Sequence, residues 1–358
     1  MKFPKFLPKR FLGIDVGTSA IKVVELSSFA GRKKLENYGE ISAPALYQKQ
    51  FRTFEKSTLS LSSEDISKAI KAIVEEAGMK SHRAIFSIPD FCTFFTNIEL
   101  PSMSAEEVPQ AVSSEARRHI PVPLAEVTLD WQLLERMAPE EIKRLKILLV
   151  AVPNEVINQY RRIAASLNFE LLALEAEVFG LARSLVGKEE KRAIGLIDIG
   201  DRTTTCSIID KGILKTSYSF DISGDDLTER LSKGLGIDYK MAEDLKKKYG
   251  LISGQLGLEG KNIGEILLPL VNMILREIEK VFKSFYFKEG KEIEKIILAG
   301  GSALLPGLLQ YFQDYFKKEV EIANPFLKIF YPPILEESLR EIGPAYAIAV
   351  GMALRGFE

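Results

Sequence analysis

The stretch FLGIDVGTSAIKVVEL, from Phe11 to Leu26, is the part of this sequence that decides the fold. Two apolar runs, Phe11–Ile14 and Ile21–Leu26, are typical of buried strands, and a short polar turn separates them. Because Gly17 in that turn can adopt a positive φ, the pattern predicts a tight β-hairpin.

The tip of this hairpin has the chemistry of a phosphate site. Gly17, Thr18 and Ser19 offer backbone N–H groups and two hydroxyls, which are the groups that hold phosphate oxygens. Asp15, at the end of the first strand, is placed to hold Mg²⁺ directly or through water. Taken alone, the same residues also suit a turn with a purely structural role.

A second stretch repeats this design. Residues 193–209 read AIGLIDIGDRTTTCSII, in which an apolar run ends at Asp198 and is followed by Gly200 and then by three hydroxyls, Thr203, Thr204 and Thr205. Two hairpins of one design, far apart in the chain, indicate a duplicated domain. If the two tips face each other, they could hold a triphosphate from both sides.

A third stretch, IILAGGSALLPGL from Ile296 to Leu308, reads as a strand followed by the start of a helix. Between them stand Gly300, Gly301 and Ser302, and glycines there let backbone approach a flat or charged ligand closely.

These three stretches, in this order, resemble the actin-like ATPase superfamily, which includes actin, the heat-shock chaperone ATPase domain, sugar kinases and FtsA. In this resemblance Asp15–Lys22 is the first phosphate motif, Asp198–Thr205 the second and Gly300–Gly307 the adenosine motif. Two linking helices match as well: LEAEVFGLAR (Leu174–Arg183), with Glu177 at its acidic position, and GPAYAIAVGMAL (Gly343–Leu354), with a small-residue face of Ala345, Ala347 and Gly351.

The segment after residue 80 narrows the resemblance. Its pattern predicts strand, strand, helix, strand, strand and helix between residues 83 and 167, which is typical of a small separate α/β subdomain. The helix is expected to begin with a capping box between Ser104 and Glu107. FSIPD, IELP, EARRHIP and LDW in this segment resemble the type IV pilus assembly protein PilM, the FtsA-like family of the superfamily.

The resemblance implies an α/β fold of the actin-like ATPase type: duplicated ribonuclease H-like domains with an inserted α/β subdomain of the FtsA and PilM kind. The first lobe is expected to cover residues 1–190, with its core in 1–80 and 166–190 and the insert in 81–165. The second lobe is expected in 191–340, with a helical part at about 224–292, and residues 341–358 form a helix that returns to the first lobe.

The resemblance also implies a set of residues for ATP and Mg²⁺. Asp15 and Asp198 are the expected Mg²⁺ residues, and Glu177 with Asp198 the candidates for catalysis. Glu177 could orient a water molecule, or it could be an ordinary helix acid. Arg202 could pair with phosphate or point outward. The residues expected to bind the nucleotide are Asp15, Gly17, Thr18, Ser19, Lys22, Gly200, Thr203, Thr204, Gly224, Glu243, Lys246, Gly300, Gly301 and Ser302.

Three of these residues lie outside the three stretches. Gly224 follows a predicted strand and opens a helix with Asp225 and Asp226, so its N–H faces the phosphates. Glu243 and Lys246 are three residues apart on a predicted helix and share one face. By the resemblance they contact ribose and adenine, although the spacing alone equally suits a surface salt bridge.

For function, the resemblance implies an ATP-binding scaffold that recruits the cytoplasmic N-terminal segment of the membrane protein PilN to a pilus or secretion platform. The protein is then expected to be cytoplasmic, held at the inner membrane through its partner and at most a slow ATPase. Self-association is left open. Two alternatives remain: a small-molecule kinase of the superfamily and an FtsA-like filament former in cell division.

The composition agrees with these expectations. A length of 358 residues suggests about two domains, and 46% hydrophobic with 27% charged residues is typical of a globular protein. A formal net charge of −1 argues against a general nucleic-acid binder. Cys92 and Cys206 lie in apolar runs and are expected to be reduced core residues. The basic start, MKFPKFLPKR, is read as a loosely docked lead-in, or else as a contact with anionic lipid or a partner.

Overall fold

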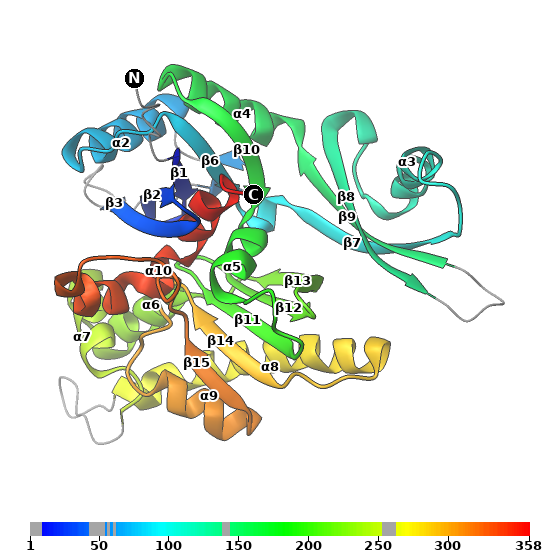
Figure 1. Cartoon of the computed structure of the whole chain (residues 1–358). Coiled ribbons are helices and arrows are strands. Elements are labelled where there is room, and N and C mark those ends of the chain that lie inside the picture. The colour runs from blue at the N-terminus through cyan, green and yellow to red at the C-terminus, as the bar shows by residue number, and fades with distance from the viewer. Residues whose placement is uncertain (1–8, 43–53, 56–57, 60–61, 138–143, 253–262) are drawn as a thin grey trace, which may run out of the picture.

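The computed structural model describes residues 9–42, 54–55, 58–59, 62–137, 144–252 and 263–358. These residues form two lobes, each built on a five-stranded sheet, and a smaller three-stranded sheet that projects to one side (Figure 1). Of the basic lead-in MKFPKFLPKR, residues 1–8 lie outside the described residues.

The first sheet begins with the predicted hairpin. Strands β1 (Lys9–Val16), β2 (Ala20–Phe29) and β3 (Arg32–Ser42) are antiparallel neighbours, and β6 (Arg83–Ile88) and β10 (Glu170–Ala176) extend the sheet in parallel with β1. The strand order is β10-β6-β1-β2-β3. The turn between β1 and β2 is closed by the Gly17 N–H, which donates to the Ala20 carbonyl at 3.0 Å.

The second sheet repeats the first, strand by strand. Its order, β13-β12-β11-β14-β15, makes β11 (Ala193–Ile199) the counterpart of β1 and β12 (Thr204–Asp210) the counterpart of β2, while β13 (Ile213–Phe220), β14 (Lys295–Ala299) and β15 (Glu319–Ile322) complete the set. The Gly200 N–H donates to the Thr203 carbonyl at 3.0 Å, which is the same closure as in the first hairpin. The predicted duplication is therefore confirmed.

Two helices connect the lobes, and they cross at a pair of glycines. Helix α5 (Glu177–Leu185) follows β10, and α10 (Glu336–Arg355) runs between the two sheets (Figure 1). A Cβ on Gly351 would lie 1.9 Å from the Gly180 carbonyl oxygen, so only glycine permits this crossing. Of the small-residue face predicted for the last helix, Gly351 lies at this contact.

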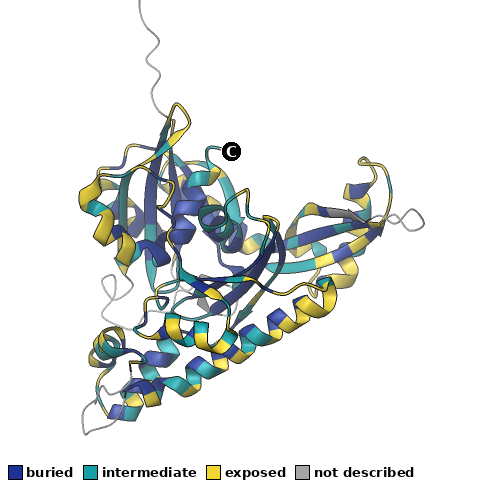
Figure 2. Ribbon diagram, turned by 60° about the horizontal axis from the view of Figure 1, so that its bottom comes forward, coloured by how far each residue is buried: buried dark blue, intermediate teal, exposed yellow. Residues whose placement is uncertain are grey.

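The remaining helices cover the outer faces of the two sheets. Helices α2 (Ser63–Glu76) and α4 (Asn154–Ser166) share the core of the first lobe. Helices α6 (Gly224–Leu235), α7 (Tyr239–Tyr249), α8 (Ile263–Glu289) and α9 (Leu308–Phe316) contribute to the core of the second. The long α8 buries one face and exposes the other (Figure 2). In the described part of the chain, no helix has both the length and the hydropathy for crossing a bilayer.

The insert is smaller than we predicted. It consists of β7 (Phe94–Pro101), α3 (Val108–His119), β8 (Val127–Met137) and β9 (Arg144–Pro153), with the sheet order β7-β9-β8 and a core of its own. The strand at Arg83–Ile88 and the helix at Asn154–Ser166, which we expected in the insert, belong to the sheet and core of the first lobe. The separate unit therefore has three strands and spans about 94–153, less than the predicted 81–165.

Smaller differences concern helix starts. Ser104 and Glu107 do bond to each other, but in a turn that precedes α3, which begins at Val108. The N-cap of α2 is Ser62, whose side chain accepts from the Asp65 N–H. Cys92 and Cys206 are buried, and no disulfide joins them, as predicted.

The short elements complete the described chain: strands β4 (Phe54–Glu55) and β5 (Thr58–Leu59) pair with each other, and 3₁₀ turns lie at η1 (Asp90–Cys92), η2 (Leu124–Glu126) and η4 (Pro333–Leu335).

Candidate functional site

Asp15 and Asp198 occupy equivalent places in the two sheets. Asp15 pairs across its hairpin with Lys22, and Asp198 pairs across the second hairpin with Thr205. Burial raises the pKa of both carboxyls, and the negative charge of Asp15 helps to raise the pKa of Asp198 to about 6. Lys22 opposes both shifts. The ends of β1 and β11 therefore lie close enough for their charges to interact between the lobes.

Two further acids join this pair. Burial, followed by the charges of Asp15, Asp90 and Asp198, raises the pKa of Glu177 well above its usual value. Burial raises the pKa of Asp90 to about 8, and Asp198 adds to that shift. Four carboxyl groups with raised pKa values and one nearby lysine form a site in which a cation is electrostatically favoured.

Asp90 is a candidate residue that our sequence analysis missed. It lies in η1, directly after β6, and β6 runs parallel to β1. Because the carboxyl ends of neighbouring parallel strands meet at one edge of a sheet, an acid two residues beyond β6 belongs near Asp15. Ser87, in the same segment, donates to Asp15 Oδ1 at 2.8 Å. Correct pairing of β6 with β1 would have revealed both residues.

In the second lobe, three loops meet at the hairpin tip. The Gly224 N–H at the start of α6 donates to the Gly200 carbonyl at 2.9 Å, and the Asp225 N–H donates to the Asp201 carbonyl at 2.9 Å. After β14, the Ser302 N–H donates to the Ile199 carbonyl at 3.2 Å. The predicted residues Gly200, Gly224 and Ser302 are thus brought together, although they are about 100 residues apart at the extremes.

Gly300 and Gly301 have different surroundings. Gly300 has a φ of +88°, and a Cβ there would lie 2.4 Å from Asp198 Oδ1, so this glycine lets the loop approach the acid. A Cβ on Gly301 would meet no heavy atom within 4 Å. The backbone at Gly301 therefore faces open space beside Asp198, which fits the close approach of a flat ligand.

Helix α7 holds Glu243 and Lys246 where we predicted, on one face. Lys246 is 5% exposed, and its ammonium donates to the Gly224 carbonyl at 2.9 Å and to Thr228 Oγ1 at 2.7 Å, besides an ion pair with Glu243 at 2.6 Å. The fold thus supplies three acceptors for this ammonium. Lys246 fixes α7 to α6, and a nucleotide would contact its methylene chain or Glu243 rather than an unoccupied charge.

Thr204 requires a correction. We expected its hydroxyl to face a phosphate, but Thr204 is fully buried and its Oγ1 donates to the Ile222 carbonyl at 2.6 Å. The hydroxyl holds the segment before α6. Thr203, Thr18 and Ser19 are half-buried at the two hairpin tips.

Asp201 is a second residue that we missed. Burial, and next the charge of Asp225, raises its pKa to about 6, whereas Lys246 and Lys22 lower it. It follows Gly200 directly, in the place that Thr18 has in the first hairpin, so comparison of the two hairpins could have identified it. Arg202 beside it is half-buried.

The acids do not form a preformed metal cage. Among the described residues, no group of three or more histidine, cysteine, aspartate or glutamate side chains is arranged to hold one ion. Mg²⁺ commonly binds one or two carboxylates and takes its other ligands from water and phosphate. Asp15 and Asp198 fit that pattern, in which a nucleotide would complete the coordination.

Comparisons with known proteins agree with this architecture. Residues 13–357 match the family model described as type IV pilus assembly protein PilM. A solved PilM-PilN type IV pilus biogenesis complex has a chain that is similar over 97% of this chain and 98% of that one, with a TM-score of 0.82 and 24% identity.

More distant relatives share the fold. MreB5 of Spiroplasma citri, solved with AMPPNP, is similar over 99% of this chain and 97% of its own, with a TM-score of 0.56 and 16% identity. The cell division protein FtsA of Enterococcus faecalis is 21% identical over 355 residues, which cover 88% of this chain and 78% of FtsA. The fold is that of the actin-like ATPases, and the chain belongs to the PilM family of type IV pilus assembly proteins.

Proposed function

We propose that this chain binds ATP with Mg²⁺ between its two lobes and serves as an actin-like scaffold of a type IV pilus or related secretion platform. The observation that carries the nucleotide part is the convergence of the two hairpins. Asp15 and Asp198 stand at equivalent strand ends, and the negative charge of Asp15 raises the pKa of Asp198, whereas Lys22 lowers the pKa of both. A divalent cation between them would relieve this repulsion, and the hairpin tips would hold the phosphates.

Each lobe has its own part in binding. The first lobe would supply the tip Gly17-Thr18-Ser19 and the Lys22 ammonium. The second would supply the tip Gly200–Thr203, the start of α6 at Gly224 and the loop Gly300–Ser302. Because the ligand would touch both lobes, its binding would fix the angle between them. Nucleotide-bound MreB5 has the same fold, which supports this assignment.

The raised pKa of Glu177 fits a site that binds ATP better than it fits one that hydrolyses ATP rapidly. Burial, and next the charge of Asp15, raises the pKa of Glu177 well above its usual value, so this carboxyl holds its proton more tightly than an ordinary glutamate does. A protonated carboxyl can orient a water molecule through its oxygens, but it cannot accept a proton from it. We therefore expect ATP turnover to be slow at most.

The partner part of the proposal rests on the insert and on the family. The insert has its own core and projects from the first lobe (Figure 1). The related solved complex contains PilN. We infer that the insert and the adjoining first lobe receive the N-terminal cytoplasmic segment of a PilN-like membrane protein, which would hold this cytoplasmic chain at the inner membrane.

A cross-linking experiment tests the partner assignment. A peptide with the N-terminal sequence of the organism's own PilN-like protein, carrying a photoreactive group, would be bound to the full chain and irradiated. We expect cross-links on residues 94–153 and on the neighbouring first lobe, and none with a scrambled peptide. Cross-links confined to residues 193–322 would contradict the assignment.

A turnover assay tests the scaffold assignment. With Mg·ATP present, the full chain would be incubated with a panel of sugars and other small phosphate acceptors. We expect no acceptor to raise ATP consumption above the rate with water. Rapid transfer to one acceptor would identify a kinase and would overturn the scaffold.

A further inference from the structure

The end of the first sheet that lies farthest from the β1–β2 turn carries a group of basic side chains. Lys9, the first residue of β1, pairs with Ser28 of β2, and Ser28 pairs with Lys33 of β3. Arg32 pairs with Phe29 in the next position. Lys328 belongs to the segment that adjoins β3, where the Phe330 N–H donates to the Lys33 carbonyl at 2.9 Å. We call Lys9, Arg32, Lys33 and Lys328 the basic end.

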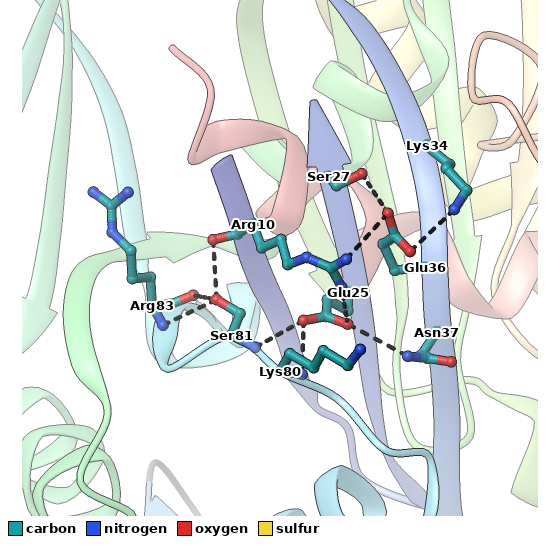
Figure 3. A network of polar contacts seen from close by, with 9 residues as sticks. All are labelled: Arg10, Glu25, Ser27, Lys34, Glu36, Asn37, Lys80, Ser81 and Arg83. Atoms are coloured by element: carbon teal, nitrogen blue, oxygen red, sulfur yellow. Dashed lines mark hydrogen bonds and ion pairs between the residues drawn. The ribbon is translucent and has the colours of Figure 1, made fainter. Parts of the chain in front are cut away.

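These four side chains have no acidic partner among the described residues, in contrast to the basic groups beside them. Arg10 contacts Glu25 at 3.5 Å and Glu36 at 3.7 Å, and Lys34 contacts Glu36 at 3.1 Å (Figure 3). The fold thus neutralises Arg10 and Lys34 and leaves the basic end charged.

The repulsion inside the basic end is visible at Lys33. Burial lowers the pKa of Lys33, and the positive charge of Lys9 lowers it further. The Lys33 ammonium lies 3.8 Å from the centre of the Phe357 ring, a contact that offsets only part of this cost. An external anion would be favoured here.

Large apolar side chains are exposed at the same end. Phe29 is 67% exposed, Leu327 is 76% exposed and Phe330 is 65% exposed. The segment that carries the last two is firmly held, because its residues Phe326 and Ile329 are buried in the core with α10. Leu327 and Phe330 are therefore presented outward by a fixed backbone.

We propose that the basic end and its exposed apolar side chains, Phe29, Leu327 and Phe330, dock on an anionic phospholipid surface. Basic groups attract the headgroups, and apolar and aromatic side chains enter the interface between headgroups and acyl chains. Within the described part of the chain these basic groups have no acidic partner, and the three apolar side chains are largely exposed. This contact goes beyond the partner-mediated attachment proposed above and does not depend on nucleotide.

The residues before the described part of the chain have the same character in sequence. They include Lys2 and Lys5 together with Phe3 and Phe6, and they are joined to β1 at Lys9. Their contribution can be separated from that of the described residues by truncation.

Sedimentation with vesicles tests the proposal. The full chain would be mixed with vesicles of equal parts phosphatidylglycerol and phosphatidylcholine, and with vesicles of phosphatidylcholine alone, at about 50 mM and about 500 mM salt. We expect binding to the anionic vesicles at low salt, about tenfold weaker at high salt, and none to the neutral ones. Absence of binding to anionic vesicles at low salt would overturn the proposal.

Matched variants locate the surface. Arg32→Glu with Lys328→Glu, and separately Phe330→Ser, are expected to lower vesicle binding by about tenfold. Arg276→Glu with Lys288→Glu, and Phe287→Ser, make the same changes on the exposed face of α8 and are expected to leave binding unchanged. Equal loss in both sets would overturn the proposal.

Two other outcomes would assign the surface differently, and each counts against the proposal. If binding survives the Arg32 and Lys328 changes but is lost on removal of residues 1–8, the lead-in is the lipid contact. If the full chain forms dimers without lipid, by sedimentation velocity, and Phe330→Ser abolishes them, the surface binds a second copy.

Discussion

The carboxylate of Glu177 accepts a hydrogen bond from the backbone N–H of Asp90 at 3.1 Å. The contact is reciprocal, because Asp90 Oδ1 accepts the N–H of Val178, the residue after Glu177, at 3.2 Å. The acid at the start of α5 is thereby fixed to the segment that leads from β6 into the insert. These two hydrogen bonds therefore connect the site between the lobes with the segment that enters the insert.

The first prediction concerns pH. The pKa of Asp90 is about 8 in the folded chain, well above the usual value, so between about pH 4 and pH 8 the folded state binds more protons than the unfolded one. The free energy of unfolding of the nucleotide-free chain should therefore fall as pH rises through this range. Asp90→Asn keeps the acceptor for Val178 and should flatten that fall, by on the order of 1 kcal/mol per pH unit at most.

Urea unfolding at several pH values between 5 and 8 measures this effect. At pH 8 Asp90→Asn should be more stable than the unchanged chain. Asp314→Asn, at an exposed aspartate of α9, serves as the control and should leave the slope as it is. Identical slopes for the Asp90 variant and the unchanged chain would show that Asp90 is not held protonated.

The second prediction separates two adjacent glycines. Gly300→Ala should destabilise the chain by on the order of 2 kcal/mol, because φ is +88° and the new Cβ would meet Asp198 Oδ1 at 2.4 Å. Gly301→Ala should leave the free energy of unfolding nearly unchanged, since its Cβ meets nothing within 4 Å. If the nucleotide occupies that space, Gly301→Ala should still weaken nucleotide binding by about tenfold.

Thermal unfolding with and without Mg·ATP measures both parts. If Mg·ATP raises the unfolding temperature of the Gly301 variant as much as that of the unchanged chain, the nucleotide does not bind beside Gly301.

The sequence predicted well what depends on local pattern. The two hairpins and the opening of α6 at Gly224 follow from apolar runs and glycines. These features are set by residues close together in the chain, so no tertiary information was needed.

What the sequence did not predict depends on distant pairing. The strand at Arg83–Ile88 has the same apolar character as a strand of the insert, and only its neighbours β1 and β10 assign it to the first sheet. Asp90 was missed for that reason. The satisfied ammonium of Lys246 and the buried hydroxyl of Thr204 were missed because their acceptors, Gly224 and Ile222, are 22 and 18 residues away.

The third prediction concerns the crossing of α5 and α10. Gly351→Ala would place a Cβ 1.9 Å from the Gly180 carbonyl oxygen, so the two helices must separate. We expect a loss on the order of 3 kcal/mol in the free energy of unfolding. Gly187→Ala is the control, because its Cβ would meet only the flexible end of Lys328 at 3.1 Å. A stable Gly351 variant would contradict the described crossing.

The fourth prediction tests the structural role of Lys246. Lys246→Met should destabilise the chain by about 3 kcal/mol, because it removes the buried ammonium that pairs with Glu243 and donates to the Gly224 carbonyl. Lys240→Met, at an exposed position of the same helix, should change stability by less than about 0.5 kcal/mol. Chemical unfolding of both variants provides the comparison. Equal stabilities of the two variants would contradict a structural role for Lys246 and would favour a direct contact between its ammonium and the nucleotide.

The measurement that tests the central claim most directly is titration calorimetry of the full chain with Mg·ATP, for the unchanged protein and for Asp198→Ala. We expect one binding site per chain, with affinity lowered by about tenfold or more in the variant and lost when Mg²⁺ is chelated. Since burial and the charge of Asp15 both disfavour an ionised Asp198, the variant should stay folded without nucleotide. Absence of binding to the unchanged chain, or equal affinity for both proteins, would contradict a nucleotide held between Asp15 and Asp198.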